Sequence, residues 1–84
     1  MSNQKGNIDA AIRRQVEYYF CQDNFSKDKY LQKKVSEHPQ GYISLKEIMS
    51  FNKMRNLSKK PEQVLKAIEG SKIVEISPDR KMLR

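Results

Sequence analysis

The chain of 84 residues contains no tryptophan, one cysteine (Cys21) and one histidine (His38). One cysteine cannot form an internal disulfide, and one cysteine with one histidine cannot supply the three or four ligands of a zinc site. The three glycines form no phosphate-binding loop, and there is no Ser/His/Asp set, no Cys/His set and no obvious pair of carboxylates. We therefore expect no enzyme, no metal site and no cofactor, and we interpret Cys21 and His38 as structural.

Long apolar runs are also missing. No stretch approaches the roughly 18 to 20 apolar residues of a membrane span, and the polar start MSNQKGN lacks the apolar region of a secretory signal. The sequence therefore predicts a soluble, intracellular protein without a membrane partner. A hydrophobic content of 37% permits one small core, so we expect a single monomeric domain.

Positive charge is abundant. Seventeen Lys and Arg residues against ten Asp and Glu residues give a formal net charge of +7, and the pI is near 9.7. Such a balance indicates a polyanionic partner, either nucleic acid or an anionic membrane surface, and charge alone does not choose between them.

The first half of the chain has the pattern of two helices. Residues 1–7 are polar and aperiodic, which predicts a flexible leader. A helix is then expected from Ile8 to about Cys21 or Gln22, because its apolar residues recur at spacings of three and four. Asp23 and Asn24 are expected to break it. Ser26 is suited to cap a second helix, which carries Tyr30, Leu31 and Val35 and ends before His38.

The second half predicts two further helices and a hairpin. Ser44 and Glu47 form a capping-box pattern before a helix that carries Leu45, Ile48, Met49 and Phe51. Another helix is expected to begin between Ser58 and Pro61, to bury Val64, Leu65 and Ile68, and to stop at Gly70. Residues 72–76 and 81–84 are expected to form a hairpin around a turn at 77–80. The most economical fold class is mainly α with a small antiparallel β-sheet, a winged helix-turn-helix.

Three adjacent rings occur in QVEYYF, residues 15–20. Neighbouring helical residues point about 100° apart, so the three rings cannot all enter one core. Phe20 is assigned to the core, whereas Gln15, Tyr18 and Tyr19 form an i, i+3, i+4 cluster at the border of the buried face. The tyrosines either close the rim of the core with their hydroxyls in water or offer ring faces to a ligand.

Two more clusters combine rings with charged side chains, one at Asp28, Lys29 and Tyr30 and the other over residues 51–55. Single-stranded nucleic acid needs this combination, because bases stack on rings while cations contact phosphates. Phe51 alone also fits a core position, and the pair Lys59–Lys60 also fits the solvated start of a helix.

The motifs QVEYYF, Asp23–Asn24, KDKYL (27–31), GYISL (41–45) and SFNKM (50–54) resemble the La motif, the RNA-binding module of La and the La-related proteins. Their order and spacing match from about residue 8 to the terminal hairpin. The resemblance implies an elaborated winged helix over residues 8–84 that works beside an RNA-recognition motif. It also implies a nuclear protein, with possible shuttling to the cytoplasm, that binds the UUU-OH 3′ ends of RNA polymerase III transcripts, protects them from exonucleases and aids their maturation as an RNA chaperone.

The resemblance also implies which residues bind RNA: Gln15, Tyr18, Tyr19, Asp28, Tyr30 and Phe51, with Asn52 in support. In this assignment Asp28 accepts hydrogen bonds from the 2′- and 3′-hydroxyls of the last ribose, and Gln15 reads a uracil edge. Tyr18, Tyr30 and Phe51 offer stacking faces, and Tyr19 either donates a hydrogen bond or supports the pocket wall. Tyr30 stands where the family usually has phenylalanine.

Three alternatives remain open. Retention of the whole binding set favours the genuine La branch over La-related branches in which these positions diverge, although a La-related protein bound stably to one small nuclear RNA shares most of it. A winged-helix DNA-binding domain would place the helix near 45–51 in the major groove, where few of its side chains can read bases. A winged helix that binds proteins would use its basic charge for solubility.

Overall fold

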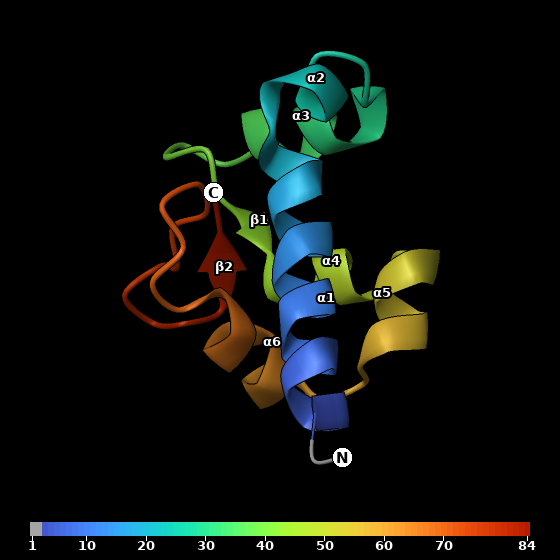
Figure 1. Cartoon of the computed structure of the whole chain (residues 1–84). Helices are drawn as coiled ribbons and strands as arrows, with labels where there is room; N and C mark the ends of the chain where they lie inside the picture. The colour runs from blue at the N-terminus through green and yellow to red at the C-terminus, as the bar shows by residue number, and fades with distance from the viewer. Residues whose placement is uncertain (1–2) are drawn as a thin grey trace.

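The computed structural model of the chain describes residues 3–84, and Met1 and Ser2 lie outside the described residues. Six helices and two short strands follow one another in the order α1 (Asn3–Phe20), α2 (Gln22–Phe25), α3 (Lys29–Ser36), β1 (Ile43–Ser44), α4 (Leu45–Met49), α5 (Asn52–Leu57), α6 (Pro61–Ile68) and β2 (Met82–Leu83). The expected fold class, mainly α with a small antiparallel sheet, is confirmed (Figure 1). Within residues 3–84 no helix combines the length and the apolar character needed to cross a membrane.

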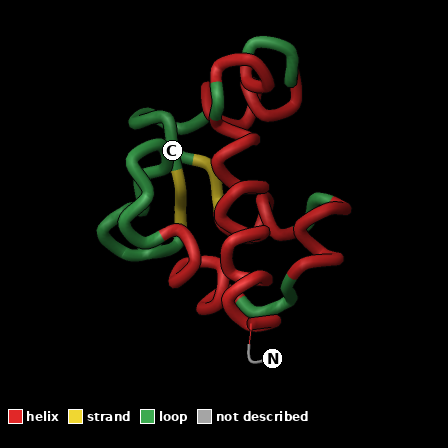
Figure 2. The backbone as a smooth tube through the Cα atoms, viewed as in Figure 1, coloured by secondary structure: helices red, strands yellow, loops and turns green. Residues whose placement is uncertain are grey.

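Helix α1 forms the axis of the molecule. Helix α6 and the strands lie along one side of it and α4 and α5 along the other, while α2 and α3 sit at its C-terminal end (Figures 1 and 2). Strand β1 pairs antiparallel with β2, with Ile43 opposite Leu83 and Ser44 opposite Met82. Chain segments from the middle and the end of the sequence therefore close the small sheet together.

The predicted terminal hairpin forms, but its first strand is shorter than expected. Ile76 makes an isolated bridge to Leu83, and the Ser77 amide donates to the Met82 carbonyl over 2.9 Å. The turn at residues 77–80 is confirmed, with Arg80 in the left-handed region at φ 60°. Glu75 and Arg84 exchange two backbone hydrogen bonds of 2.7 and 2.9 Å, so this arm of the hairpin pairs over residues 75–77 and lies on the edge of β2 opposite β1, whereas residues 72–74 make no strand.

The core gathers apolar side chains from five of the six helices, α2 being the exception, and from both strands. Its fully buried side chains are Ile12, Val16, Leu31, Ile43, Ile48, Met54, Val64, Ile68 and Leu83. The assignment of Phe20 to the core and Tyr19 to its border is corrected, since Tyr19 is 8% exposed and Phe20 packs only partly buried at the edge. Tyr19 follows Ile12 by seven residues and lies about 20° from it around the helix, whereas Phe20 lies about 80° away.

Three boundaries in the first half differ from expectation. Helix α1 begins at Asn3, before the predicted start at Ile8, since a single glycine costs a helix only about 1 kcal/mol. It breaks at Cys21, which is extended at φ −71° and ψ 152°, and Asp23 and Asn24 belong to the short helix α2. The Asn24 side-chain amide donates to the Tyr19 carbonyl over 3.2 Å, so this residue caps the end of α1 rather than breaking it.

The cap of α3 is also corrected. Asp28, not Ser26, occupies the N-cap, and its Oδ1 accepts a hydrogen bond from the Leu31 amide at 2.9 Å. The Ser26 hydroxyl instead donates to the Asp23 carbonyl. An N-cap oxygen must reach the amide two or three residues ahead, and Ser26 lies too early in the chain for a helix that begins at Lys29.

The local signals of the second half are largely confirmed. Ser44 caps α4 by accepting from the Lys46 amide, α6 has Pro61 in its first turn, and Gly70 ends the helical region with φ +81°. The predicted helix through Phe51 is divided instead, because Phe51 is extended and begins the separate helix α5. Helix α5 was not expected from the sequence.

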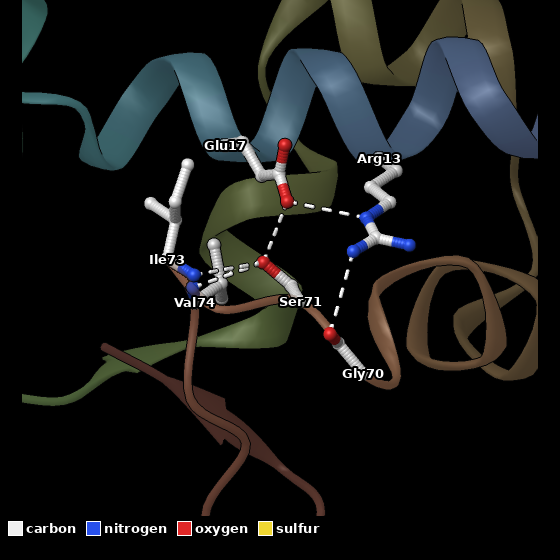
Figure 3. Close-up of polar contacts among 6 residues, drawn as sticks. All are labelled: Arg13, Glu17, Gly70, Ser71, Ile73 and Val74. Atoms are coloured by element: carbon white, nitrogen blue, oxygen red, sulfur yellow. Dashed lines mark hydrogen bonds and ion pairs between the residues drawn. The ribbon is translucent and has the colours of Figure 1, made fainter.

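A polar cluster ties α1 to the loop that follows α6 (Figure 3). The Ser71 hydroxyl donates to Glu17 Oε2 over 2.6 Å, and Arg13 Nε donates to the same oxygen over 3.2 Å. Arg13 also reaches the Gly70 carbonyl at 3.4 Å, and Ser71 Oγ accepts from the amides of Ile73 and Val74. The loop before the hairpin is therefore held by one carboxylate of α1.

Replacing Glu17 by glutamine should lower the free energy of unfolding by about 1 kcal/mol at pH 7. The hydrogen bond from Ser71, followed by the bond and charge of Arg13, lowers the pKa of Glu17 below its ordinary 4.5. A lowered pKa gives stability that is complete above pH 4.5 and is lost as the pH falls through the folded-state value. Urea unfolding from pH 3 to pH 7 should show the two stability curves converging in acid. The exposed Glu37→Gln variant is the control, and parallel curves for Glu17→Gln and the unsubstituted chain would contradict the assignment.

Candidate nucleic-acid interface

Four aromatic rings from three parts of the chain form a continuous row. Tyr18 and Tyr19 lie at the end of α1 with their ring centroids 6.3 Å apart. Phe51, between α4 and α5, packs edge-on against Tyr19 at 4.9 Å, and Tyr30 of α3 packs edge-on against Phe51 at 6.0 Å. The three sequence clusters that contain these rings therefore meet at one surface.

Exposure varies along the row. Tyr18 and Tyr30, at the two ends, are 52% and 48% exposed, whereas Tyr19 is buried and Phe51 is half-buried between them. Edge-to-face packing is a favourable geometry for aromatic pairs, so the inner rings fix the outer ones in place. The row thus presents two wet ring faces on a rigid support, and Tyr19 belongs to the support.

Gln15, Tyr19 and Asp28 converge beside the row. Burial raises the pKa of the Tyr19 phenol, the nearby Gln15 side-chain amide opposes the rise, and the negative charge of Asp28 adds to it. The phenol therefore stays protonated and can donate. Asp28 uses Oδ1 for its cap bond to Leu31, and among residues 8–84, whose side chains are described, no group donates to its Oδ2. One carboxylate oxygen at this surface thus keeps its capacity to accept hydrogen bonds.

Tyr30 is held by a contact that the sequence did not reveal. Its hydroxyl donates to Glu47 Oε1, and this bond raises the pKa of the Tyr30 phenol. Lys34 Nζ lies 4.0 Å from the other Glu47 oxygen and 5.6 Å from the centre of the Tyr30 ring. Phenylalanine could not make the bond to Glu47. The glutamate of the predicted capping box therefore orients a ring instead of closing the box with Ser44.

Two cations lie beside the row in a shallow hollow. Gln15 and Tyr18 line a hollow of about 350 Å³ together with Arg14 and Lys53. Arg14 was not singled out from the sequence, since nothing in its spacing distinguishes it from other exposed cations of α1. Lys53 reaches the hollow only because α5 forms.

Asn52 faces elsewhere. It lines a separate hollow of about 400 Å³ with Arg55, Asn56 and Lys59. Among the described side chains no hydrogen bond joins Asn52 to the aromatic row, although it follows Phe51 directly. The structure therefore brings together six of the seven predicted residues, Gln15, Tyr18, Tyr19, Asp28, Tyr30 and Phe51, and places Asn52 at their edge.

Comparisons with known proteins give a consistent answer. The family model of the La domain matches residues 12–70. The La protein homolog of Aedes albopictus is 34% identical over 92% of this chain and 20% of its own length, and La-related protein 7 of Mus musculus is 31% identical over 89% of this chain and 13% of its own. The solved La autoantigen N-terminal domain superposes with a TM-score of 0.86 at 28% identity, covering 100% of this chain and 87% of that one. The chain thus spans a fifth or less of these two curated relatives.

Proposed function

This chain belongs to the La domain family, the RNA-binding module of La and La-related proteins, and from that premise we propose that it binds the free 3′ ends of RNAs that finish in uridines. The proposed binding residues are Gln15, Tyr18, Tyr19, Asp28, Tyr30 and Phe51, with Asn52 in support. The proposal is carried by one observation, the aromatic row with a carboxylate beside it.

The exposed rings supply sequence-tolerant binding. A base stacked on Tyr18 or Tyr30 gains about 1 to 3 kcal/mol, and the ring faces are already ordered by Phe51 and Tyr19. Arg14 and Lys53 lie where they can neutralise phosphates beside Tyr18. A uracil edge presents both donors and acceptors, and the Gln15 amide can match them.

Asp28 supplies the preference for an RNA end. A carboxylate repels phosphates, yet one carboxylate oxygen has two lone pairs and can accept from the 2′- and 3′-hydroxyls of a terminal ribose. DNA lacks the first hydroxyl, and an internal nucleotide lacks the second. A 3′-phosphate would bring like charges together. Oδ2 of Asp28, which no described donor occupies, fits this role without loss of the helix cap.

The geometry gives less support to DNA binding through α4. Leu45 and Ile48 are buried, and Glu47 is engaged by Tyr30 and Lys34. Only Lys46 remains in the middle of this helix as an exposed polar side chain, and a single flexible lysine reads base edges poorly.

For the longer protein we propose the biology that the family implies. An adjacent RNA-recognition motif would complete the uridine pocket, and the bound RNAs would be polymerase III transcripts that are protected from exonucleases and matured in the nucleus. Relatives from the La and the La-related branches match this chain at similar identity, so the preference for genuine La stays a prediction.

An NMR titration tests the proposal on the chain as it stands. The ¹⁵N-labelled protein is titrated with a short RNA that ends in UUU-OH and with the same RNA ending in a 3′-phosphate. We expect chemical-shift changes at Gln15, Tyr18, Tyr19, Asp28 and Tyr30 with the hydroxyl end only. Equal, dispersed changes at Lys and Arg residues with both RNAs would show that the domain recognises charge and not the end.

A further inference from the structure

A third and larger hollow lies between the later helices and the hairpin turn. It is a groove of about 900 Å³ between α4, the end of α5, α6 and the hairpin turn. None of the seven predicted RNA-binding residues lines it. The RNA-binding residues proposed above therefore do not account for this groove.

The floor of this groove is aliphatic. Leu45 and Met49 contribute from α4, and Pro61 and Leu65 contribute one face of α6. Leu45 and Leu65 belong to the hydrophobic core and are almost fully buried, whereas Met49 is half-buried and Pro61 is exposed. Pockets that take apolar side chains have this kind of lining and this range of volume.

The rim is strongly basic. Lys46, Arg55, Lys59, Arg80 and Lys81 surround the floor, all exposed, and Glu62 is the one carboxylate that lines the groove. Arg80 pairs with Glu69 at 2.8 Å, and the other four cations make no ion pair within residues 3–84. Exposed lysine and arginine side chains without an ion-pair partner add little to the stability of the fold. Four such cations around an apolar floor are therefore complementary in charge to an acidic ligand.

Nucleic acid fits this groove less well than protein. The chain has four tyrosines, three phenylalanines and no tryptophan, and none of them lines the groove. Single-stranded RNA gains most of its base contacts from aromatic faces, and an aliphatic floor without polar readers offers bases little. Leucine, isoleucine and methionine side chains fill such a floor better.

We propose that this groove binds an acidic amphipathic helix of a protein partner. Aliphatic side chains at positions i, i+4 and i+7 of that helix lie on Leu45, Met49 and Leu65. Glutamate and aspartate residues along its flanks face the cations of the rim and speed association. None of the four rings of the aromatic row lines the groove, although its rim cations Arg55 and Lys59 also line the hollow of Asn52. The inference does not depend on the RNA specificity proposed above.

The test uses a synthetic peptide of about 15 residues, capped at both ends, with leucines at helical spacing and glutamates on both flanks. A scrambled peptide of identical composition is the control for charge alone. In NMR titrations we expect the patterned peptide to shift the amides of Lys46, Met49, Lys59 and Leu65 with a Kd of about 100 µM, and the scrambled peptide to bind at least tenfold more weakly.

Two variants decide the result. Met49→Glu places a negative charge on the half-buried floor and should reduce binding of the patterned peptide at least tenfold, while Tyr18→Ala should leave it unchanged. No shift with the patterned peptide up to millimolar concentration, equal binding of both peptides, or insensitivity to Met49→Glu would overturn the proposal. Shifts at the groove residues with a 3′-phosphate RNA in place of the peptide would assign the surface to nucleic acid instead.

Discussion

Replacing Asp28 by asparagine should weaken binding of an RNA that ends in UUU-OH by about 10- to 100-fold. A carboxylate that accepts from two ribose hydroxyls makes charge-assisted bonds, each worth about 1.5 to 3 kcal/mol, and asparagine offers only a neutral oxygen. Asparagine is as good an N-cap as aspartate, so the bond to Leu31 and helix α3 should survive. Isothermal titration or NMR with the hydroxyl-ended and phosphate-ended RNAs gives the measurement.

The controls separate recognition from charge. Asp23→Asn removes the same charge from an exposed residue of helix α2 and should change affinity less than twofold. Asp28→Asn should also narrow the difference between the two RNAs, because the phosphate-ended RNA no longer meets a negative side chain. Stronger binding of both RNAs to Asp28→Asn would instead indicate general attraction to phosphates, and the proposed role of Asp28 would be wrong.

Local chemistry made part of the fold predictable. Ser44, Pro61 and Gly70 act through their own backbone or through an amide two residues away, so their effects can be read from short stretches of sequence. The same holds for the hairpin turn at 77–80. The sequence predicted Ser26 as the cap of the second helix, and Asp28 holds that position instead, because the residue at which the helix begins depends on packing.

Long-range packing made the rest unpredictable. The buried face of α1 includes Tyr19 and leaves Phe20 at its edge. A rotation of the helix by one residue would exchange the two rings, and the sequence does not fix that rotation. Residues of the binding set were identified by resemblance, and their contacts came only with the structure. The hydrogen bond from Tyr30 to Glu47 spans 17 positions, and no pattern in the sequence pairs those two residues.

Helix α5 shows how packing replaces local signals. It has six residues, and its N-cap, Phe51, makes no side-chain capping bond. So short a helix is unstable alone, because nucleation costs more than a few hydrogen bonds return. Its one fully buried side chain is Met54, while Asn52, Lys53 and Arg55 are exposed. The packing of Met54 in the core, together with that of the partly buried Leu57, therefore holds α5 in place.

Met54→Ala should accordingly lower the free energy of unfolding by about 2 to 5 kcal/mol, a large share of the roughly 5 to 15 kcal/mol that stabilises a typical domain. The midpoint of thermal unfolding should fall by roughly 10 to 30 °C. Met49→Ala is the matched control, because the same deletion at a half-buried site should cost about 1 kcal/mol or less. Urea unfolding of both variants measures the difference.

The Met54 site also links stability to the RNA surface. Phe51 joins Tyr19 to Tyr30 at the start of α5, so loosening this helix should release the centre of the aromatic row. At a temperature where the variant is still folded, Met54→Ala should weaken binding of UUU-OH RNA, whereas Met49→Ala should not. Equal destabilisation by the two substitutions would mean that α5 is held by other contacts, and unchanged RNA affinity in a destabilised Met54→Ala variant would show that the rings keep their places without it.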